Sequence, residues 1–257
     1  MRPLNIRGKV RNASGLPLVC TPLIGNTVEA IEGELAAILP LSPDLIEWRV
    51  DYFAHIDNSA QVIEVARKIR HAAGEIPLIF TRRAAHEGGQ AITISEEYVV
   101  ALYEEVCASG AIDVVDYELS QSAVHRTRVR AAAHANNLAL IFSYHNFVES
   151  PGVDELVGIM ADAEKQGADI AKVAVMPKAQ MDVLTLLAAT LAADNALRIP
   201  VITMSMGSMG AVSRLCGGAF GSAVTFAVGS GASAPGQIAI GDLRTAQQIL
   251  QRAGSDA

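Results

Sequence analysis

A single lysine stands in the middle of an apolar stretch, in the sequence Asp169-Ile-Ala-Lys172-Val-Ala-Val-Met176. Of the five lysines in the chain, only Lys172 falls inside a predicted strand. Removing an ammonium from water is costly, and an apolar interior favours the neutral amine that attacks a ketone to form an imine. A strand-end lysine that reaches solvent or pairs with a carboxylate is the other interpretation, and this segment alone leaves both open.

A histidine occupies a comparable position in another segment. His145 directly follows the predicted strand Leu138–Tyr144 and is itself followed by Asn146. Imidazole titrates near neutrality and can both take and return a proton, although a histidine at a strand end can also be a hydrogen-bonded structural residue. No two of the six histidines have the spacing of a metal site, so the sequence predicts no metal.

Acidic and basic residues alternate at the ends of two further predicted strands. Residues two apart in a strand point to the same face, so Glu47, Arg49 and Asp51 share one face, and Asp116 and Glu118 share another. Such a group is either a structural layer of ion pairs or a cradle for a polar substrate, and spacing does not decide between them.

Two other segments carry groups that could hold an anion. Arg82 and Arg83 would point to opposite faces of a strand, so at most one of them should enter a site. Arg214 precedes a glycine-rich stretch, residues 229–237, that contains Ser233 and Gln237. These glycine-rich turns could bind a phosphate through backbone N–H groups, or they could form a mobile lid that binds a carboxylate and hydroxyls.

Short apolar stretches of strand character recur about every 30 residues, which is room for one helix and two loops. They are Leu18–Cys20, Leu45–Val50, Leu78–Arg82, Ile112–Tyr117, Leu138–Tyr144, Asp169–Val175, Ile199–Thr203 and Ala223–Ala227. Helical periodicity fills the intervals, as at Val28, Ile31, Leu35 and Ile38. Eight such units could lie open as a doubly wound sheet, but their number favours a closed (β/α)₈ TIM barrel, with the polar strand ends at its carboxyl rim.

Length and composition suit an α/β protein with a large core. The 257 residues are 51% hydrophobic, and we expect one barrel domain over residues 1–257 in which residues 1–16 are a loosely held extension. A net charge of −7 argues against nucleic acid as a partner, and no apolar run is long enough to span a membrane. Three widely spaced cysteines are consistent with a reducing cytoplasm.

Taken jointly, the polar segments resemble those of the type I 3-dehydroquinate dehydratases, in the same order along the chain. The segments that carry the resemblance are Glu47-Trp-Arg49-Val-Asp51, Arg83-Ala-Ala-His-Glu87-Gly-Gly, Asp116-Tyr-Glu118, Ser143-Tyr-His145-Asn-Phe147, Ala171-Lys172-Val-Ala, Met206-Gly, Ser213-Arg214 and Ser233-Ala-Pro-Gly-Gln237. The spacing of arginine and glutamate in that family selects Arg83 over Arg82.

The resemblance implies a cytoplasmic enzyme, commonly a homodimer, that converts the small molecule 3-dehydroquinate to 3-dehydroshikimate without a cofactor. Lys172 would form the imine, His145 would transfer the proton, and Glu87 would orient or polarise the histidine. Two groups of residues would contact the substrate. They are Glu47, Arg49 and Arg83 for the hydroxyls, and Arg214, Ser233 and Gln237 for the carboxylate.

Two other functions use some of the same residues. A class I aldolase or transaldolase would use the strand lysine to cleave a carbon–carbon bond, but those enzymes often bind sugar phosphates, and no clear phosphate-binding motif is present. A catalytically silent barrel could bind a polyhydroxy acid, but binding alone requires neither Lys172 nor His145.

Overall fold

The structure is a computed structural model that describes residues 2–10, 16–229, 231 and 233–255. Its strands are β1 (Asn5–Ile6), β2 (Lys9–Val10), β3 (Leu18–Leu23), β4 (Leu45–Arg49), β5 (Leu78–Thr81), β6 (Val114–Glu118), β7 (Ala139–Asn146), β8 (Ile170–Val175), β9 (Val201–Ser205), β10 (Val224–Val228) and β11 (Ile238–Ala239). Its α-helices are α1 (Val28–Ile38), α2 (Ser59–Ala73), α3 (Glu96–Ala108), α4 (Ala123–Ala135), α5 (Val153–Lys165), α6 (Gln180–Ala196), α7 (Gly207–Cys216) and α8 (Ile240–Ser255).

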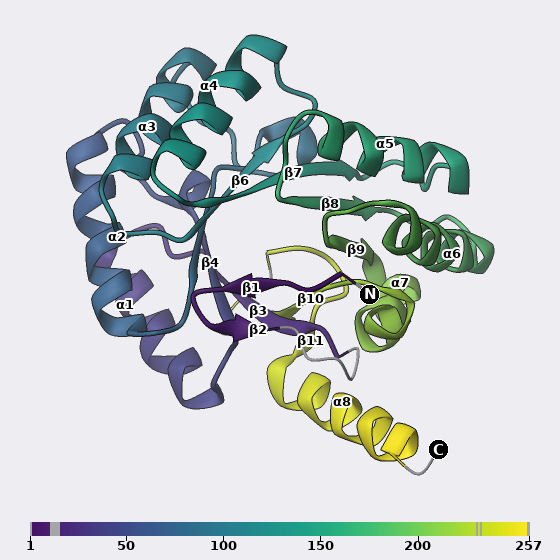
Figure 1. Ribbon diagram of the computed structural model, residues 1–257. Helices are drawn as coiled ribbons and strands as arrows, with labels where there is room; N and C mark the ends of the chain where they lie inside the picture. Colours follow the sequence, from purple (N-terminus) through teal and green to yellow (C-terminus); the bar gives the residue numbers. More distant parts are fainter. Residues whose placement is uncertain (1, 11–15, 230, 232, 256–257) are drawn as a thin grey trace.

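Strands β3 to β10 form a closed ring. Each strand from β3 to β8 pairs in parallel with the next one along the chain, and β10 pairs with β3. The last gap is closed by a parallel bridge between Val201 and Ser222, beside a 2.7 Å hydrogen bond from the Ala223 N–H to the Val201 carbonyl. The helices lie around the outside of this ring (Figure 1). The predicted (β/α)₈ barrel is therefore confirmed, and the open doubly wound sheet is not.

Strand alternation divides the apolar residues between two cores. Outward-facing side chains such as Trp48, Phe80 and Phe142 pack against the helices. Inward-facing side chains from the amino-terminal half of each strand fill the bottom of the barrel, and they include Leu18, Leu45, Ile79, Val114, Ile141, Ile170, Ile202 and Val224. Because this floor is apolar and packed, the polar inward residues are confined to the carboxyl half of the barrel.

The observed strands begin or end a few residues from their predicted limits. The largest difference is at β3, which was expected to end at Cys20 but continues through Pro22 to Leu23. Strand β10 pairs with β3 only as far as Cys20, so Pro22 has a strand partner on one side alone, opposite Glu47 of β4. A residue without a backbone N–H is tolerated at such a position.

The prediction that residues 1–16 form a loosely held extension was wrong for the part that the structure describes. Strands β1 and β2 pair as an antiparallel hairpin. Leu4 and Ile6 are 5% exposed and join the apolar cluster at the bottom of the barrel. Arg7 pairs with Glu75 and Asp113. Residues 1 and 11–15 lie outside the described residues.

This packing makes the hairpin a contributor to stability. We expect Ile6→Ala to lower the free energy of unfolding by about 2–4 kcal/mol, because it removes apolar volume from a closed core. Val10→Ala, at a position 48% exposed in the same hairpin, should change it by less than about 0.5 kcal/mol. Urea unfolding measures both values. Equal effects from the two substitutions would show that the hairpin does not close the barrel.

Candidate active site

Lys172 lies at the middle of β8 with its side chain inside the barrel. In the parallel register it sits beside Ser143 of β7 and Ile202 of β9, on the inward face of the ring. The residue is 4% exposed. Its Nζ donates hydrogen bonds to Asp116 Oδ2 at 2.7 Å and to Glu47 Oε1 at 3.3 Å, and it lies 4.5 Å from the centre of the Phe226 ring. The amine is therefore in a charged pocket rather than the apolar interior that the sequence suggested.

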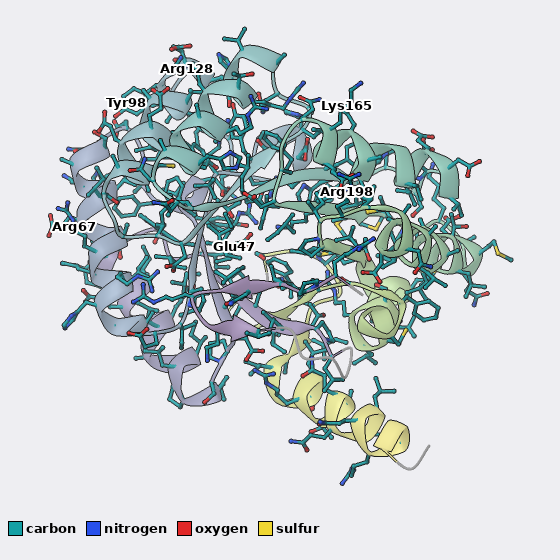
Figure 2. The ribbon with its side chains drawn as sticks, in the orientation of Figure 1. Glu47, Arg67, Tyr98, Arg128, Lys165 and Arg198 are labelled. Atoms are coloured by element: carbon teal, nitrogen blue, oxygen red, sulfur yellow. The ribbon has the colours of Figure 1, made fainter. Side chains whose placement is uncertain are left out.

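Glu47 comes from β4, across the ring from β8, and Asp116 comes from β6, which is separated from β8 only by β7. Glu47 points from β4 toward the centre of the ring, whereas labelled surface residues such as Arg67 and Arg128 point outward (Figure 2). Asp116 Oδ1 accepts hydrogen bonds from Arg83 Nη2 at 2.7 Å and from Ser143 Oγ at 2.5 Å. Burial opposes ionisation of Asp116, but Arg83 and Lys172 outweigh it and hold its pKa well below the ordinary value. Asp116 is thus an anion that bridges two buried cations.

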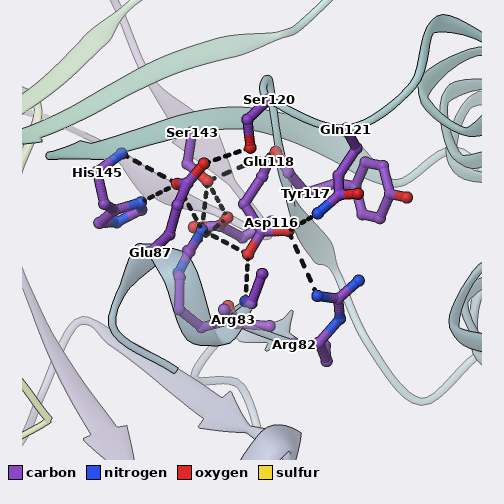
Figure 3. Close-up of polar contacts among 12 residues, drawn as sticks. Arg82, Arg83, Glu87, Asp116, Tyr117, Glu118, Ser120, Gln121, Ser143 and His145 are labelled. Carbon is purple, nitrogen blue, oxygen red and sulfur yellow. Dashed lines mark hydrogen bonds and ion pairs between the residues drawn. The ribbon is translucent and has the colours of Figure 1, made fainter. Parts of the chain in front are cut away.

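His145 lies on the neighbouring strand β7 and is closer to the carboxyl rim than Lys172. It pairs with Ala174, two residues beyond Lys172, so both side chains face the same interior. Glu87 Oε2 accepts a 3.0 Å hydrogen bond from the His145 backbone N–H and lies 2.9 Å from Nδ1 (Figure 3). We assign the ring proton to Nδ1 on this geometry, which leaves Nε2 as the basic nitrogen.

Burial and nearby charges set the protonation of this pair. Burial, together with Arg83 and Lys172, lowers the pKa of His145 well below its ordinary value, so the ring is neutral at pH 7. Burial also raises the pKa of Glu87 from 4.5 to about 7, against the opposing effect of Arg83. A neutral imidazole held by a partly ionised carboxyl group is suited to accept a proton and to return it.

The Glu87 carboxyl group should make stability depend on pH. Between pH 4.5 and about 7 the folded protein retains a proton that the unfolded chain has lost, so the free energy of unfolding falls as pH rises through this window. We expect the contribution to be about 3 kcal/mol. Urea unfolding of the wild type and Glu87→Gln at pH 5 and pH 8 measures it, because the substitution removes the titrating group. Parallel curves for the two proteins would contradict this assignment.

The adjacent arginines lie on opposite sides of the barrel wall. Arg83 points inward and donates to Asp116, to Ser143 Oγ at 2.7 Å and to Glu118 at 3.2 Å. Arg82 points outward, where it pairs with Glu96 and lies 3.8 Å from the second oxygen of Glu118. Figure 3 shows the two guanidinium groups approaching Glu118 from different sides. The structure thus places Arg83, and not Arg82, beside the cavity.

Of the three residues expected to bind a carboxylate, two line the cavity and one does not. Ser233 and Gln237 line the cavity and hydrogen-bond to each other, with 3.2 Å from Gln237 Nε2 to Ser233 Oγ. Arg214 is 2% exposed and lies behind the cavity wall, where it donates to the Pro235 carbonyl at 3.2 Å and to the Phe226 carbonyl at 3.4 Å. Burial lowers its pKa to about 10, and no carboxylate among the described residues pairs with it. Residues 230 and 232 lie outside the described residues.

These side chains surround one cavity at the carboxyl end of the barrel, with about 430 Å³ of space that includes its opening to solvent. Its polar lining consists of eight of the nine predicted site residues, which are Glu47, Arg49, Arg83, Glu87, His145, Lys172, Ser233 and Gln237. The rest of its lining is largely apolar and was not predicted. It consists of Gly88, Phe147, Ala174, Met204, Met206, Phe226 and Ala234.

Strand alternation could have identified some of these apolar lining residues. Ala174 is two residues from Lys172, and Met204 and Met206 follow Ile202 at the same period, so all share the inward face. Gly88 has φ +84° and lies against the Phe147 ring, where an added Cβ would come within 2.2 Å of a ring carbon. That contact joins two distant segments, and no local pattern indicates it.

Two further features concern ligands and membranes. Among residues 2–10, 16–229, 231 and 233–255, no three His, Cys, Asp or Glu side chains are grouped as ligands for a metal ion. None of the helices in the same residues is both long and apolar enough to cross a membrane.

The fold and the cavity define a (β/α)₈-barrel enzyme that presents a lysine amine and a neutral imidazole to a small molecule at its carboxyl rim. The sequence matches the family model described as Type I 3-dehydroquinase over residues 19–253. The chain belongs to the type I 3-dehydroquinase family, and it is a carbon–oxygen lyase.

Individual relatives agree over almost the whole chain. The 3-dehydroquinate dehydratase of Albidiferax ferrireducens is 50% identical over 255 residues, which are 99% of this chain and 97% of the relative. The crystal structure of the Geobacillus kaustophilus 3-dehydroquinate dehydratase has a TM-score of 0.95 at 45% identity and covers 98% of this chain and 97% of its own. The type I enzyme of Clostridium difficile, solved with covalent modified comenic acid, has a TM-score of 0.92 at 37% identity, with 98% of each chain covered.

Proposed function

We propose that the protein dehydrates 3-dehydroquinate to 3-dehydroshikimate through an imine on Lys172, with His145 as the proton carrier. The observation that carries the proposal is that the buried Lys172 amine and the His145 ring line the same cavity from neighbouring strands. Glu87 Oε2 lies 2.9 Å from His145 Nδ1. The substrate is suggested by the names of relatives at 40–50% identity, which are 3-dehydroquinate dehydratases. Family membership also favours dehydration over carbon–carbon cleavage by an aldolase.

The amine must lose a proton before it attacks. Asp116 is a poor acceptor because its pKa is held far below the ordinary value. Glu47 lies 3.3 Å from Nζ and lines the cavity, and we assign the proton to it. The neutral amine adds to the ketone, Glu47 returns the proton to the former carbonyl oxygen, which leaves as water, and a protonated imine forms on Lys172. Asp116 and the face of the Phe226 ring then stabilise the positive charge.

The iminium withdraws electrons from the adjacent carbon, so His145 Nε2 can remove a proton from it and leave an enamine. The enamine expels the β-hydroxyl, and the proton carried by His145 leaves with that oxygen as water. Hydrolysis of the product imine restores Lys172. Glu87 stabilises the imidazolium in the interval between the two proton transfers, as the carboxylate of a catalytic triad does.

Polar residues around the cavity would hold the substrate. Arg49, Arg83 and Glu47 line the cavity as partners for the hydroxyl groups, and Ser233 and Gln237 line it as partners for the carboxylate. Arg214 would join them only if the segment containing Pro235 shifts, because the carbonyl of Pro235 now accepts the arginine N–H. No cofactor takes part in any of these steps.

Two finer expectations are part of the same proposal. We propose a homodimer, for which the exposed apolar side chains Met181, Leu184 and Leu191 along α6 would supply contact area. We also propose a cytoplasmic location, where a reducing environment would preserve the three free thiols of Cys20, Cys107 and Cys216. Light scattering on the purified protein measures its oligomeric state.

Ultraviolet absorbance on mixing with 3-dehydroquinate tests the activity, because the conjugated enone of the product absorbs and the substrate does not. We expect absorbance to rise at a rate proportional to protein concentration, and the rate to be unchanged after treatment with a chelator. A flat trace would refute the proposed reaction, and a rate that the chelator abolishes would refute the cofactor-free mechanism.

A further inference from the structure

Asp51 is buried just outside the cavity, and each of its two carboxylate oxygens accepts two hydrogen bonds. It follows β4 in the 3₁₀ turn Val50–Tyr52, and its side chain is 0% exposed. Oδ1 accepts hydrogen bonds from Arg49 Nε at 2.8 Å and from the Arg83 backbone N–H at 3.2 Å. Oδ2 accepts from Arg49 Nη2 at 2.8 Å and from the Gln90 backbone N–H at 3.0 Å. One carboxylate thus meets four donors from two parts of the site.

The first part is Arg49. Its bond to Asp51 is bidentate, and it fixes both the direction and the plane of the guanidinium group. Tyr52 lies under the same guanidinium, with 5.1 Å from Cζ to the ring centre. Because Asp51 occupies Nε and Nη2, it leaves Nη1 without a hydrogen-bond partner among the described residues, and Arg49 lines the cavity. Asp51 therefore turns the free edge of Arg49 toward a ligand.

The second part is residues 83–90, which we call the Glu87 loop. Asp51 binds the first N–H of this loop through one oxygen and the last N–H through the other. Between them the chain turns tightly, because the Gly89 N–H donates to the Ala84 carbonyl and a Cβ on Gly89 would lie 1.9 Å from the Arg83 carbonyl oxygen. Glu87 sits inside this closed loop, where it contacts His145.

We infer that Asp51 is a positioning residue for the reaction, which holds Arg49 toward the substrate and the Glu87 loop against His145. This role rests on the proposed function. Asp51 does not line the cavity, so it acts on the substrate only through the groups that it holds. Without it, Arg49 would lose its fixed orientation and the Glu87 loop would lose the link between its ends. A misplacement of about 1 Å at a catalytic pair can lower turnover about 100-fold.

The two contacts predict separable effects. Asp51→Asn should raise KM through Arg49 and lower kcat through Glu87, with kcat/KM falling about 100-fold. Arg49→Lys breaks the bidentate pair and also alters the edge of this side chain that faces the ligand, so it should act mainly on KM. Gln90→Pro removes one N–H donor of the Glu87 loop and also restricts the backbone at its end, so it should act mainly on kcat. The matched control is Asp57→Asn, the same substitution at an exposed carboxylate.

Borohydride trapping in the presence of 3-dehydroquinate counts the sites that form the imine, so kcat is expressed per trapped site and unfolded protein does not contribute. Hydrogen exchange of the ligand-free protein gives a second readout, in which the peptide spanning the Glu87 loop should exchange faster in Asp51→Asn than in Asp57→Asn. Faster exchange together with a lower kcat per trapped site and a higher KM supports the inference. Unchanged exchange, or a loss of activity that matches the loss of trapped sites with KM unaltered, overturns it. Absence of trapping in the wild type overturns the proposed function instead, and the exchange result then still shows whether Asp51 holds the loop.

Discussion

Replacement of Lys172 by methionine is expected to reduce turnover by about five to six orders of magnitude, as loss of an enzyme nucleophile does. Methionine is similar in length and apolar, so it fills the same space inside the barrel without an amine. His145, Glu87 and Arg83 would all remain, but without the imine no electron sink exists for removal of the C–H proton. The ultraviolet assay, run at high enzyme concentration, measures the residual rate.

The same substitution also leaves Asp116 and Glu47 without the cation that they share, which could destabilise the fold by about 3–5 kcal/mol. Lys172→Arg separates the two effects, because it retains a positive charge but cannot form an imine. Lys178→Met, at a side chain that is 61% exposed, is the matched control. Appreciable turnover by folded Lys172→Met would contradict the imine mechanism, whereas equal loss in Lys178→Met would show that the assay reports something other than the site.

His145→Ala is expected to lower turnover by about three to four orders of magnitude, near the upper end of what a general base contributes. The lysine, its two acids and the cavity wall remain in place, so the imine with 3-dehydroquinate should still form. The substituted protein should therefore accumulate a covalent adduct that mass spectrometry detects after borohydride reduction, while the enone absorbance hardly rises.

The control for this substitution is His134→Ala, because His134 lies away from the cavity and pairs with Asp169 at the amino-terminal end of β8. It should keep full turnover. If His145→Ala no longer forms the imine, His145 acts before proton abstraction, and the assignment of the Lys172 proton to Glu47 would then be wrong. If turnover falls less than about tenfold, another group carries the proton.

The strands and the central pair of residues follow from local pattern. The apolar stretches recur at a regular interval, and alternation places Lys172 and Ala174 on one face of their strand whatever the rest of the chain does. The order of the polar segments then predicts that Glu47, Arg83 and His145 share the carboxyl rim. These inferences require only the period of a strand and the topology of a barrel.

Other features depend on contacts between distant segments, which no local pattern contains. Leu4 and Ile6 were expected to belong to a loosely held extension, because no nearby residue indicates that they pack against the apolar bottom of the barrel. The position of Arg214 behind the cavity wall depends on where the Pro235 carbonyl falls. The four donors to Asp51 come from Arg49, Arg83 and Gln90, which only the folded chain brings together.

The environment of Lys172 is the most consequential of these differences. From the sequence, an apolar strand suggested that desolvation alone would produce the neutral amine. The structure instead places the Asp116 and Glu47 carboxylates within ion-pair distance of Nζ. Chemistry at this amine thus requires a proton acceptor as well as a ketone, and the cavity-facing Glu47 is placed to be that acceptor.

The most direct test of the central claim is reduction of the wild-type protein with borohydride in the presence of 3-dehydroquinate, followed by mass spectrometry of its peptides. We predict loss of activity together with an added mass on the peptide that contains Lys172, and on no peptide when the substrate is omitted. An unmodified Lys172 peptide with full activity remaining would contradict the account.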